Sequence, residues 1–163
     1  PPTAHTDELF NTSVKVALEA GLIHNGDLVI LTAGAPVGVP GTTNFMRIDT
    51  VGEVIIQGTG VGKAAVTAIV HVASTLKEAC EINKGHILVV DSTSKDYLPA
   101  IEKASAIITE AGGLTSHAAI IGLNLGIPVI VGAAGATKEL TTGQLITVDT
   151  KRGLIYRGRA TVY

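Results

Sequence analysis

The sequence has 163 residues, of which 46% are hydrophobic and 16% charged, a composition typical of a globular chain with one domain or two small ones. The net charge of −2 and the 3% of aromatic residues argue against electrostatic nucleic-acid binding, base stacking and a polybasic membrane patch. A single cysteine excludes an internal disulfide framework and a cysteine-based metal site, and it fits a reducing cytoplasm.

The first part of the chain predicts a helix followed by strands. A capping hydroxyl and two acids at residues 6–8 favour a helix start, and Gly21 is expected to end the helix. Residues 33–43 are rich in glycine and proline and predict a loop. Residues 58–63 predict a glycine-rich turn that separates this block from the rest. Strands are expected at 27–32, 45–49 and 54–57.

The remainder alternates short apolar strands with helices, which is typical of an α/β domain. Strands are expected at 66–72, 86–91, 107–109, 128–131, 145–149 and 154–157, and helices at 75–82, 97–104 and 116–125. The uncharged run 111–137 is long enough to span a bilayer, taking His117 as neutral. Its glycines and Pro128 predict a buried helix, turn and strand instead.

The glycine run at 58–63 also resembles a nucleotide-binding loop, but its spacing does not fit. A phosphate loop needs four residues before its Gly-Lys pair, whereas three separate Gly58 from Gly62. The dinucleotide fingerprint fails as well, because Lys63 stands where its third glycine should be. We therefore interpret this run as a connection.

Residues 112–121, with the sequence Gly-Gly-Leu-Thr-Ser-His-Ala-Ala-Ile-Ile, are the main candidate for chemistry. The two glycines allow a tight turn, and Thr115 is expected to cap a helix with Ser116 and His117 in its first turn. Free amides and the helix dipole favour a bound phosphate there and keep the imidazole neutral. His117 could then carry a phosphoryl group covalently, with the hydroxyls of Thr115 and Ser116 donating to its oxygens. On spacing alone, a histidine that only packs or caps is the alternative.

Other titratable residues give weaker signals. Glu110 either orients His117 or is a solvated carboxylate at a strand end. A basic cluster near the end of the chain is interpreted as a solvated face or a subunit contact: Lys151, Arg152, Arg157 and Arg159. We expect structural or surface roles, and no metal site, for the remaining histidines and the cysteine: His5, His24, His71, His86 and Cys80.

The motif around His117 resembles the phosphohistidine swivelling domain of phosphoenolpyruvate-utilising enzymes such as phosphoenolpyruvate synthase and pyruvate phosphate dikinase. The similarity runs from about residue 53 to 156 and includes the segments 85–90, 99–101, 126–132 and 143–149. It implies that His117 occupies the position of the phosphorylated histidine. Those carriers usually have an arginine six residues later, where this sequence has Leu123 and so lacks a guanidinium partner for phosphate.

The first fifty residues resemble the end of the pyruvate kinase C-terminal domain, at 8–10, 20–23, 26–34 and 43–47. Some bacterial members of that family carry an extra domain of the swivelling type in the same order. The resemblance implies a partial three-layer α/β domain followed by a swivelling β/β/α domain. The implied division is an effector-binding domain end at 1–52, a connecting strand and turn at 53–63, and the phosphohistidine-like domain at 64–163.

The pyruvate kinase resemblance also implies an effector site, because the family's C-terminal domain binds sugar-phosphate or nucleotide effectors. One effector loop matches residues 34–43, where small residues let the backbone approach a phosphate closely. A plain loop between strands fits these residues equally well. The candidate effector-binding residues are Gly34, Gly38, Gly41, Thr42 and Thr43.

Three hypotheses about function follow. The first is that the chain is a regulatory or structural part of a cytoplasmic, tetrameric pyruvate kinase. Its expected partner is then the rest of the kinase chain, and neither nucleic acid nor a membrane is expected to bind. The catalytic barrel of the pyruvate kinase family, with its Mg²⁺ and K⁺ sites, would then lie outside this chain. The chain alone would be inactive and would hold no cofactor. The second is a phosphocarrier domain phosphorylated on His117. The third is an oligomerisation module.

Overall fold

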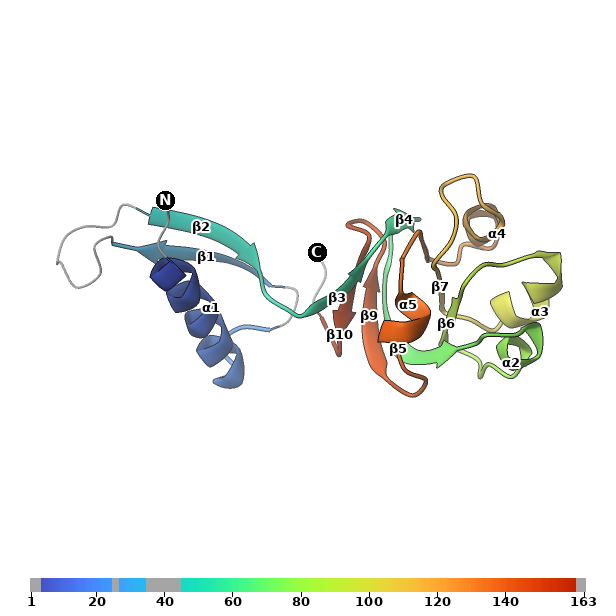
Figure 1. Ribbon diagram of the computed structural model, residues 1–163, viewed down its shortest axis with the longest axis horizontal. Coiled ribbons are helices and arrows are strands. Elements are labelled where there is room, and N and C mark those ends of the chain that lie inside the picture. Colours follow the sequence, from blue (N-terminus) through green and yellow to red (C-terminus); the bar gives the residue numbers. More distant parts are fainter. Residues whose placement is uncertain (1–3, 25–26, 35–44, 161–163) are drawn as a thin grey trace. The chain divides into compact units, whose positions relative to one another are not determined.

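The computed structural model describes residues 4–24, 27–34 and 45–160, which form two compact units (Figure 1). The first unit contains the described residues up to Gly52 together with Ala160, and the second comprises Glu53–Arg159. None of the helices in these ranges is both long and apolar enough to cross a membrane.

The first unit consists of one helix and a two-stranded antiparallel sheet. Helix α1 spans Ala4–Glu19, and Gly21 follows it with a φ of +70°, which confirms the predicted helix end. Strands β1 (Leu28–Ala33) and β2 (Phe45–Thr50) lie within one residue of their predicted bounds. Phe10 of α1 is buried, and its ring stacks on that of Phe45 with centroids 5.5 Å apart. The helix therefore packs on one face of the sheet.

The second unit is built around an eight-stranded sheet in the order β3-β10-β9-β5-β6-β7-β8-β4. The four strands β5 to β8 are parallel neighbours, and the remaining pairs are antiparallel. The strands are β3 (Val54–Gln57), β4 (Thr59–Val61), β5 (Ala65–Val72), β6 (Ile87–Val90), β7 (Ala106–Thr109), β8 (Val129–Val131), β9 (Leu145–Asp149) and β10 (Leu154–Arg157).

Helices lie between these strands, which confirms the predicted α/β fold. They are α2 (Leu76–Cys80), the 3₁₀ turn η1 (Lys95–Tyr97), α3 (Leu98–Ile101), α4 (His117–Leu125) and α5 (Ala136–Glu139). The helix predicted at 97–104 is thus a 3₁₀ turn followed by a short α-helix, and α5 was not predicted. The uncharged run forms α4, β8 and the start of α5 with their connections, which confirms the predicted helix, turn and buried strand. The helix itself is only partly buried, because Ile120, Leu123 and Leu125 are exposed.

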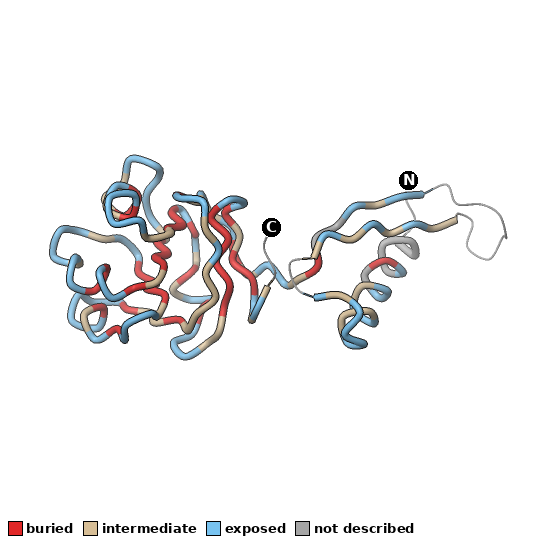
Figure 2. The backbone as a smooth tube through the Cα atoms, turned by 180° about the vertical axis from the view of Figure 1, so that it is seen from behind, coloured by how far each residue is buried: buried red, intermediate tan, exposed pale blue. Residues whose placement is uncertain are grey.

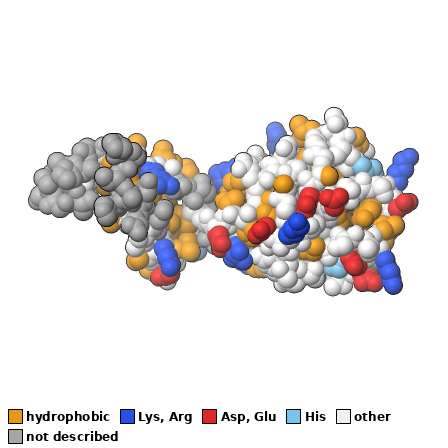
Figure 3. Space-filling model, viewed as in Figure 1, with side chains coloured by type: hydrophobic (Ala, Val, Ile, Leu, Met, Phe, Trp, Pro, Cys, Tyr) orange, Lys and Arg blue, Asp and Glu red, His pale blue; other side chains and the backbone are white. Residues whose placement is uncertain are grey.

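Two hydrophobic clusters sandwich the central sheet. Strands β6, β7 and β8 are buried at every position, as expected of parallel strands covered on both faces (Figure 2). Alternate residues enter opposite clusters, so that Leu88 and Ile107 pack with α2, α3 and α4 while Ile87 and Ile108 pack toward α5. On the face of this unit seen in Figure 3, charged side chains of both signs are interspersed.

The glycine-rich segment 58–63 differs from its predicted conformation. It is not only a turn, because Thr59–Val61 forms β4 and pairs with β8. A single residue, Gly58, separates β3 at one end of the strand order from β4 at the other. A Cβ on Gly60 would lie 1.9 Å from the carbonyl oxygen of Thr150. Glycine therefore serves here to let two backbones approach closely.

Candidate functional site

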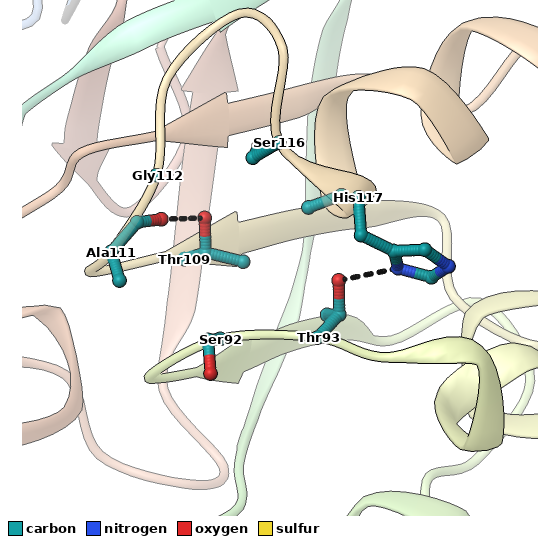
Figure 4. Close-up of a pocket in the computed structure, with 8 residues that line it drawn as sticks. Ser92, Thr93, Thr109, Ala111, Gly112, Ser116 and His117 are labelled. Carbon is teal, nitrogen blue, oxygen red and sulfur yellow. Dashed lines mark hydrogen bonds between the residues drawn. The ribbon is translucent and has the colours of Figure 1, made fainter.

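The candidate site lies at the carboxyl ends of the parallel strands β6 and β7. Ser92 and Thr93 follow β6, and the loop after β7 leads through Gly112 to the start of α4 (Figure 4). Crevices beside the carboxyl ends of parallel strands are the usual place for ligands in α/β sheets. The structure thus brings His117 next to residues that lie about 25 positions earlier in the sequence.

The hydroxyl that caps α4 belongs to Ser116. Its backbone is extended, with φ −70° and ψ 160°, and its Oγ accepts a hydrogen bond from the Ala119 amide at 3.4 Å. The prediction of Thr115 as the cap is therefore wrong by one residue, and Thr115 is exposed just before the N-terminus of α4. His117 is the first helical residue, where amide groups lack intrahelical partners.

Thr93 is the hydrogen-bond partner of His117, and the sequence reasoning did not identify it. Its Oγ1 lies 3.0 Å from His117 Nδ1 (Figure 4). When Nδ1 carries the proton, it donates to this oxygen and Nε2 keeps its lone pair. Only the sheet topology could have indicated this contact, because Thr93 follows β6, and β6 pairs in parallel with β7, the strand before the His117 loop.

The pocket beside His117 is lined by hydroxyls, small residues and the imidazole, without Asp, Glu, Lys or Arg: Ser92, Thr93, Thr109, Ala111, Gly112, Ser116, His117 and Ala118. Thr109 is buried, and its hydroxyl donates to the Ala111 carbonyl at 2.9 Å, which fixes the turn after β7. Gly112 has a φ of +99°, and a Cβ there would lie 2.8 Å from Ser116 Cβ, so the predicted role of a glycine in this tight turn is confirmed. The pocket can accept an anion through hydroxyls and amides, and its lining includes no Lys or Arg.

The side chain of Glu110 forms its hydrogen bonds with Thr137 and not with His117. Its Oε1 accepts hydrogen bonds from the Thr137 hydroxyl and, at 2.7 Å, from the Thr137 amide in the first turn of α5. The Thr137 hydroxyl, followed by its amide, holds the pKa of this carboxyl below the ordinary value of 4.5. Glu110 therefore links the end of β7 to α5.

Leu123 is 60% exposed on the outer side of α4. An apolar side chain there gives phosphate no partner, in line with the missing arginine noted in the sequence.

The other candidates are distributed over both units. Gly34 follows β1, whereas Gly38, Gly41, Thr42 and Thr43 lie outside the described residues.

Two of the basic residues near the end have acidic partners: Arg157 Nε lies 2.7 Å from Glu53 Oε2, and Arg152 Nη1 lies 3.8 Å from Asp149 Oδ2. His71 Nε2 contacts the Glu78 carbonyl at 2.7 Å, a structural role. Within the described ranges, no three His, Cys, Asp or Glu residues form a metal-binding group.

Comparison with known proteins divides the chain between two families. Residues 1–49 match the family "Pyruvate kinase, alpha/beta domain", and residues 82–153 match "PEP-utilising enzyme, mobile domain". Pyruvate kinase from Lactobacillus delbrueckii subsp. bulgaricus is 49% identical over 95% of this chain and 26% of its own length. Pyruvate kinase from Geobacillus stearothermophilus is 49% identical over 99% of this chain and 28% of its own. The chain thus spans about a quarter of these relatives and corresponds to their C-terminal portion.

Among solved structures, the solution structure of Enzyme I (nEIt) covers 48% of this chain and 33% of that chain, at 25% identity and a TM-score of 0.43.

Proposed function

We propose that this chain, which joins the end of a pyruvate kinase alpha/beta domain to a PEP-utilising mobile domain, is the regulatory and structural C-terminal part of a bacterial-type pyruvate kinase. The whole enzyme would transfer a phosphoryl group from phosphoenolpyruvate to ADP, giving pyruvate and ATP. The observation that carries the proposal is the order of the two matches. The pyruvate kinase match comes first and the mobile-domain match second in one chain. Relatives named pyruvate kinase align with nearly all of this chain.

The chain by itself is proposed to be catalytically inactive. The lining of the pocket beside His117 includes no Lys or Arg, so it offers no ammonium or guanidinium group to neutralise a phosphoryl group. Mg²⁺, K⁺, phosphoenolpyruvate and ADP would be held by the rest of the kinase. The proposed setting is a cytoplasmic homotetramer, with a sugar-phosphate or nucleotide effector near residues 34–43.

Joining this chain to the remaining part of a relative tests this proposal. The chain would replace the corresponding portion of the Lactobacillus delbrueckii enzyme, and pyruvate formation would be measured with and without His117→Ala. We expect both chimeras to be active with closely similar kcat, since the mobile domain supports the assembly without taking phosphate. A large loss of kcat in a folded His117→Ala chimera contradicts a purely structural role.

A second candidate is a phosphocarrier domain, favoured by the hydrogen bond between Thr93 and His117. With the proton on Nδ1, the lone pair of Nε2 could attack a phosphoryl group, forming an N–P bond as the donor's P–O bond breaks. Hydroxyls at Thr115 and Ser116 would then be available near the transferred oxygens. This reading requires a partner with a phosphoenolpyruvate site.

Phosphate labelling separates the two candidates. The chain would be incubated with labelled phosphoenolpyruvate and the catalytic part of phosphoenolpyruvate synthase, and acid-labile, base-stable phosphate would be counted. The carrier hypothesis requires label that disappears in His117→Ala and weakens in Thr93→Val. Absence of label in the unmodified chain refutes the carrier role.

A further inference from the structure

Helix α4 has one side packed on the sheet and another side that exposes apolar residues. The helix packs on strands β8, β7 and β4, and Ala118, Ala119 and Gly122 are its buried residues. On the other side, Ile120 is 51% exposed and Leu123 is 60% exposed. These two residues are three positions apart, so their side chains are neighbours on one face of the helix.

The composition of α4 differs from that of an ordinary surface helix. A helix at a protein surface normally has charged or polar side chains on its outer side, whereas a helix that is hydrophobic all round is normally buried. The sequence of α4 is His-Ala-Ala-Ile-Ile-Gly-Leu-Asn-Leu, without Asp, Glu, Lys or Arg. The exposed side of α4 therefore has the composition of a contact surface.

A pocket rich in glycine lies beside Leu123, where β4 ends and β8 begins. Its volume is about 200 Å³, and its lining residues are Gly62, Lys63, Ala64, Gly122, Leu123, Gly126, Ile127 and Pro128. A cavity of about 150 Å³ holds one benzene-sized group, whereas pockets for small-molecule ligands measure about 300–1,000 Å³. The pocket is therefore sized for one large apolar side chain.

We propose that the exposed side of α4 is a two-fold contact between two copies of this chain, in which Ile120 of each copy enters the pocket of the other. The same patch serves both partners in such an interface, so the patch must be complementary to itself. The exposed side of α4 meets this condition, because it presents apolar side chains and, beside them, a pocket that fits one of them. The inference does not depend on the proposed function.

The spacing along α4 supports this pairing. A two-fold axis that crosses the helix at Leu123 reverses its direction, so the two copies of α4 run antiparallel. Ile120, three residues before the axis, then lies opposite Gly126 of the other copy, three residues after it. Gly126 lines the pocket, and a Cβ at this position would meet nothing within 4 Å, so the approach is open.

Charge favours a second copy over a charged partner. Residues 111–137 contain no Asp, Glu, Lys or Arg, so the pairing of α4 with its own copy brings no like charges from this segment together. Lys63 is the one charged residue among the described residues that line the pocket. A lysine can keep its ammonium group in water while its methylene groups cover apolar surface.

Sedimentation equilibrium of the 163-residue chain over a range of concentrations tests the proposal. Ile120→Glu places a charge on the inserted side chain, and Gly126→Asn fills the pocket with a residue that tolerates the φ of +69°. Ile120→Ala is a second variant at the same position in case Ile120→Glu fails to fold. Leu28→Glu, at an exposed leucine of the first unit (61%), is the matched control for the added charge.

We expect the unmodified chain and Leu28→Glu to show the same equilibrium between monomer and dimer. Ile120→Glu and Gly126→Asn should raise the dissociation constant of the dimer by more than about tenfold, because a two-fold contact contains each substitution twice. Ile120→Ala should raise this constant by a smaller factor.

A chain that stays monomeric at every concentration overturns the proposal. A dimer that persists unchanged in both Ile120→Glu and Gly126→Asn also overturns it, because the contact then lies elsewhere. Loss of the dimer in Leu28→Glu would assign the association to the first unit and would overturn the proposal as well.

Discussion

At the scale of single residues, the hydroxyls around His117 have separate tasks. Ser116 caps the helix, Thr93 contacts Nδ1 of the imidazole, and Thr109 holds the turn after β7. Each hydroxyl can therefore be removed with a different expected consequence. The site is a set of local hydrogen bonds placed around one histidine.

Removing the helix cap tests the corrected position of that cap. Ser116→Ala should lower the free energy of unfolding by about 1 kcal/mol, because the Ala119 amide loses its acceptor. Thr115→Ala is the matched control and should change it by less than about 0.5 kcal/mol, since Thr115 is exposed and does not cap. Urea denaturation measures both values, and a larger effect at Thr115 would restore the original prediction.

The close approach at Gly60 gives a second residue-scale prediction. Gly60→Ala should destabilise the second unit by roughly 3 kcal/mol or prevent its folding, because the added Cβ meets backbone atoms of Thr150 that cannot turn aside. Gly113→Ala should be nearly neutral, since nothing lies within 4 Å of a Cβ there. Thermal denaturation of both variants compares them, and equal melting temperatures would contradict the close approach.

The motif around His117 was enough to predict a histidine at a helix start after a tight turn. The choice between Thr115 and Ser116 as the cap depends on backbone angles that two adjacent hydroxyl residues do not reveal. Thr93 could not be found from sequence, because its contact with His117 depends on the parallel pairing of β6 and β7. Local chemistry was thus predictable, whereas the partner across the sheet was not.

At the scale of elements, Glu110 connects β7 to α5 through both hydrogen-bond donors of Thr137. Helix α5 is only four residues long and has no side-chain cap of its own. A carboxylate from a neighbouring element therefore satisfies an amide in its first turn. Such a short helix, stabilised by a residue about 27 positions away, gives almost no periodic signal, which is why it was not predicted.

Acid titration tests this link. The pKa of Glu110 is lowered in the fold, so its carboxylate stabilises the fold above the ordinary value of 4.5 and this contribution disappears as the pH falls through the lowered pKa. Glu110→Gln should reduce stability modestly at pH 7 and flatten the loss of stability below pH about 4.5. Glu102→Gln, at an exposed carboxylate, is the control. Denaturation midpoints at pH 7 and pH 3 provide the comparison, and an unchanged acid slope in Glu110→Gln would contradict the assignment.

At the scale of the whole molecule, the two units differ in how complete they are. The second unit has hydrophobic clusters on both faces of its sheet, whereas the first has one helix over two strands. Continuous apolar strands and their alternating helices made the α/β fold predictable from sequence. The strand order, which sends consecutive β3 and β4 to opposite ends, depends on long-range packing that no local pattern encodes.

The second unit should therefore fold alone. A chain of residues 53–159 is expected to unfold cooperatively and to give a dispersed amide NMR spectrum, because both of its clusters are intact. A chain of residues 1–52 should remain largely unfolded, since two strands and one helix bury too little apolar surface. An unfolded 53–159 chain would show that its stability depends on the first unit.

The unbroken run through β3, Gly58 and β4 has a consequence for association. This short segment pairs with β10 through one half and with β8 through the other, and Arg157 holds its start through Glu53. If this segment frays, the backbone N–H and C=O groups of β10 and of β8 lose their hydrogen-bond partners on that side at the same time. The two open edges of the sheet, where a neighbour could add a strand, would then pass from β3 and β4 to β10 and β8. Fewer than ten residues at the start of the second unit therefore decide which strands form both edges of its sheet.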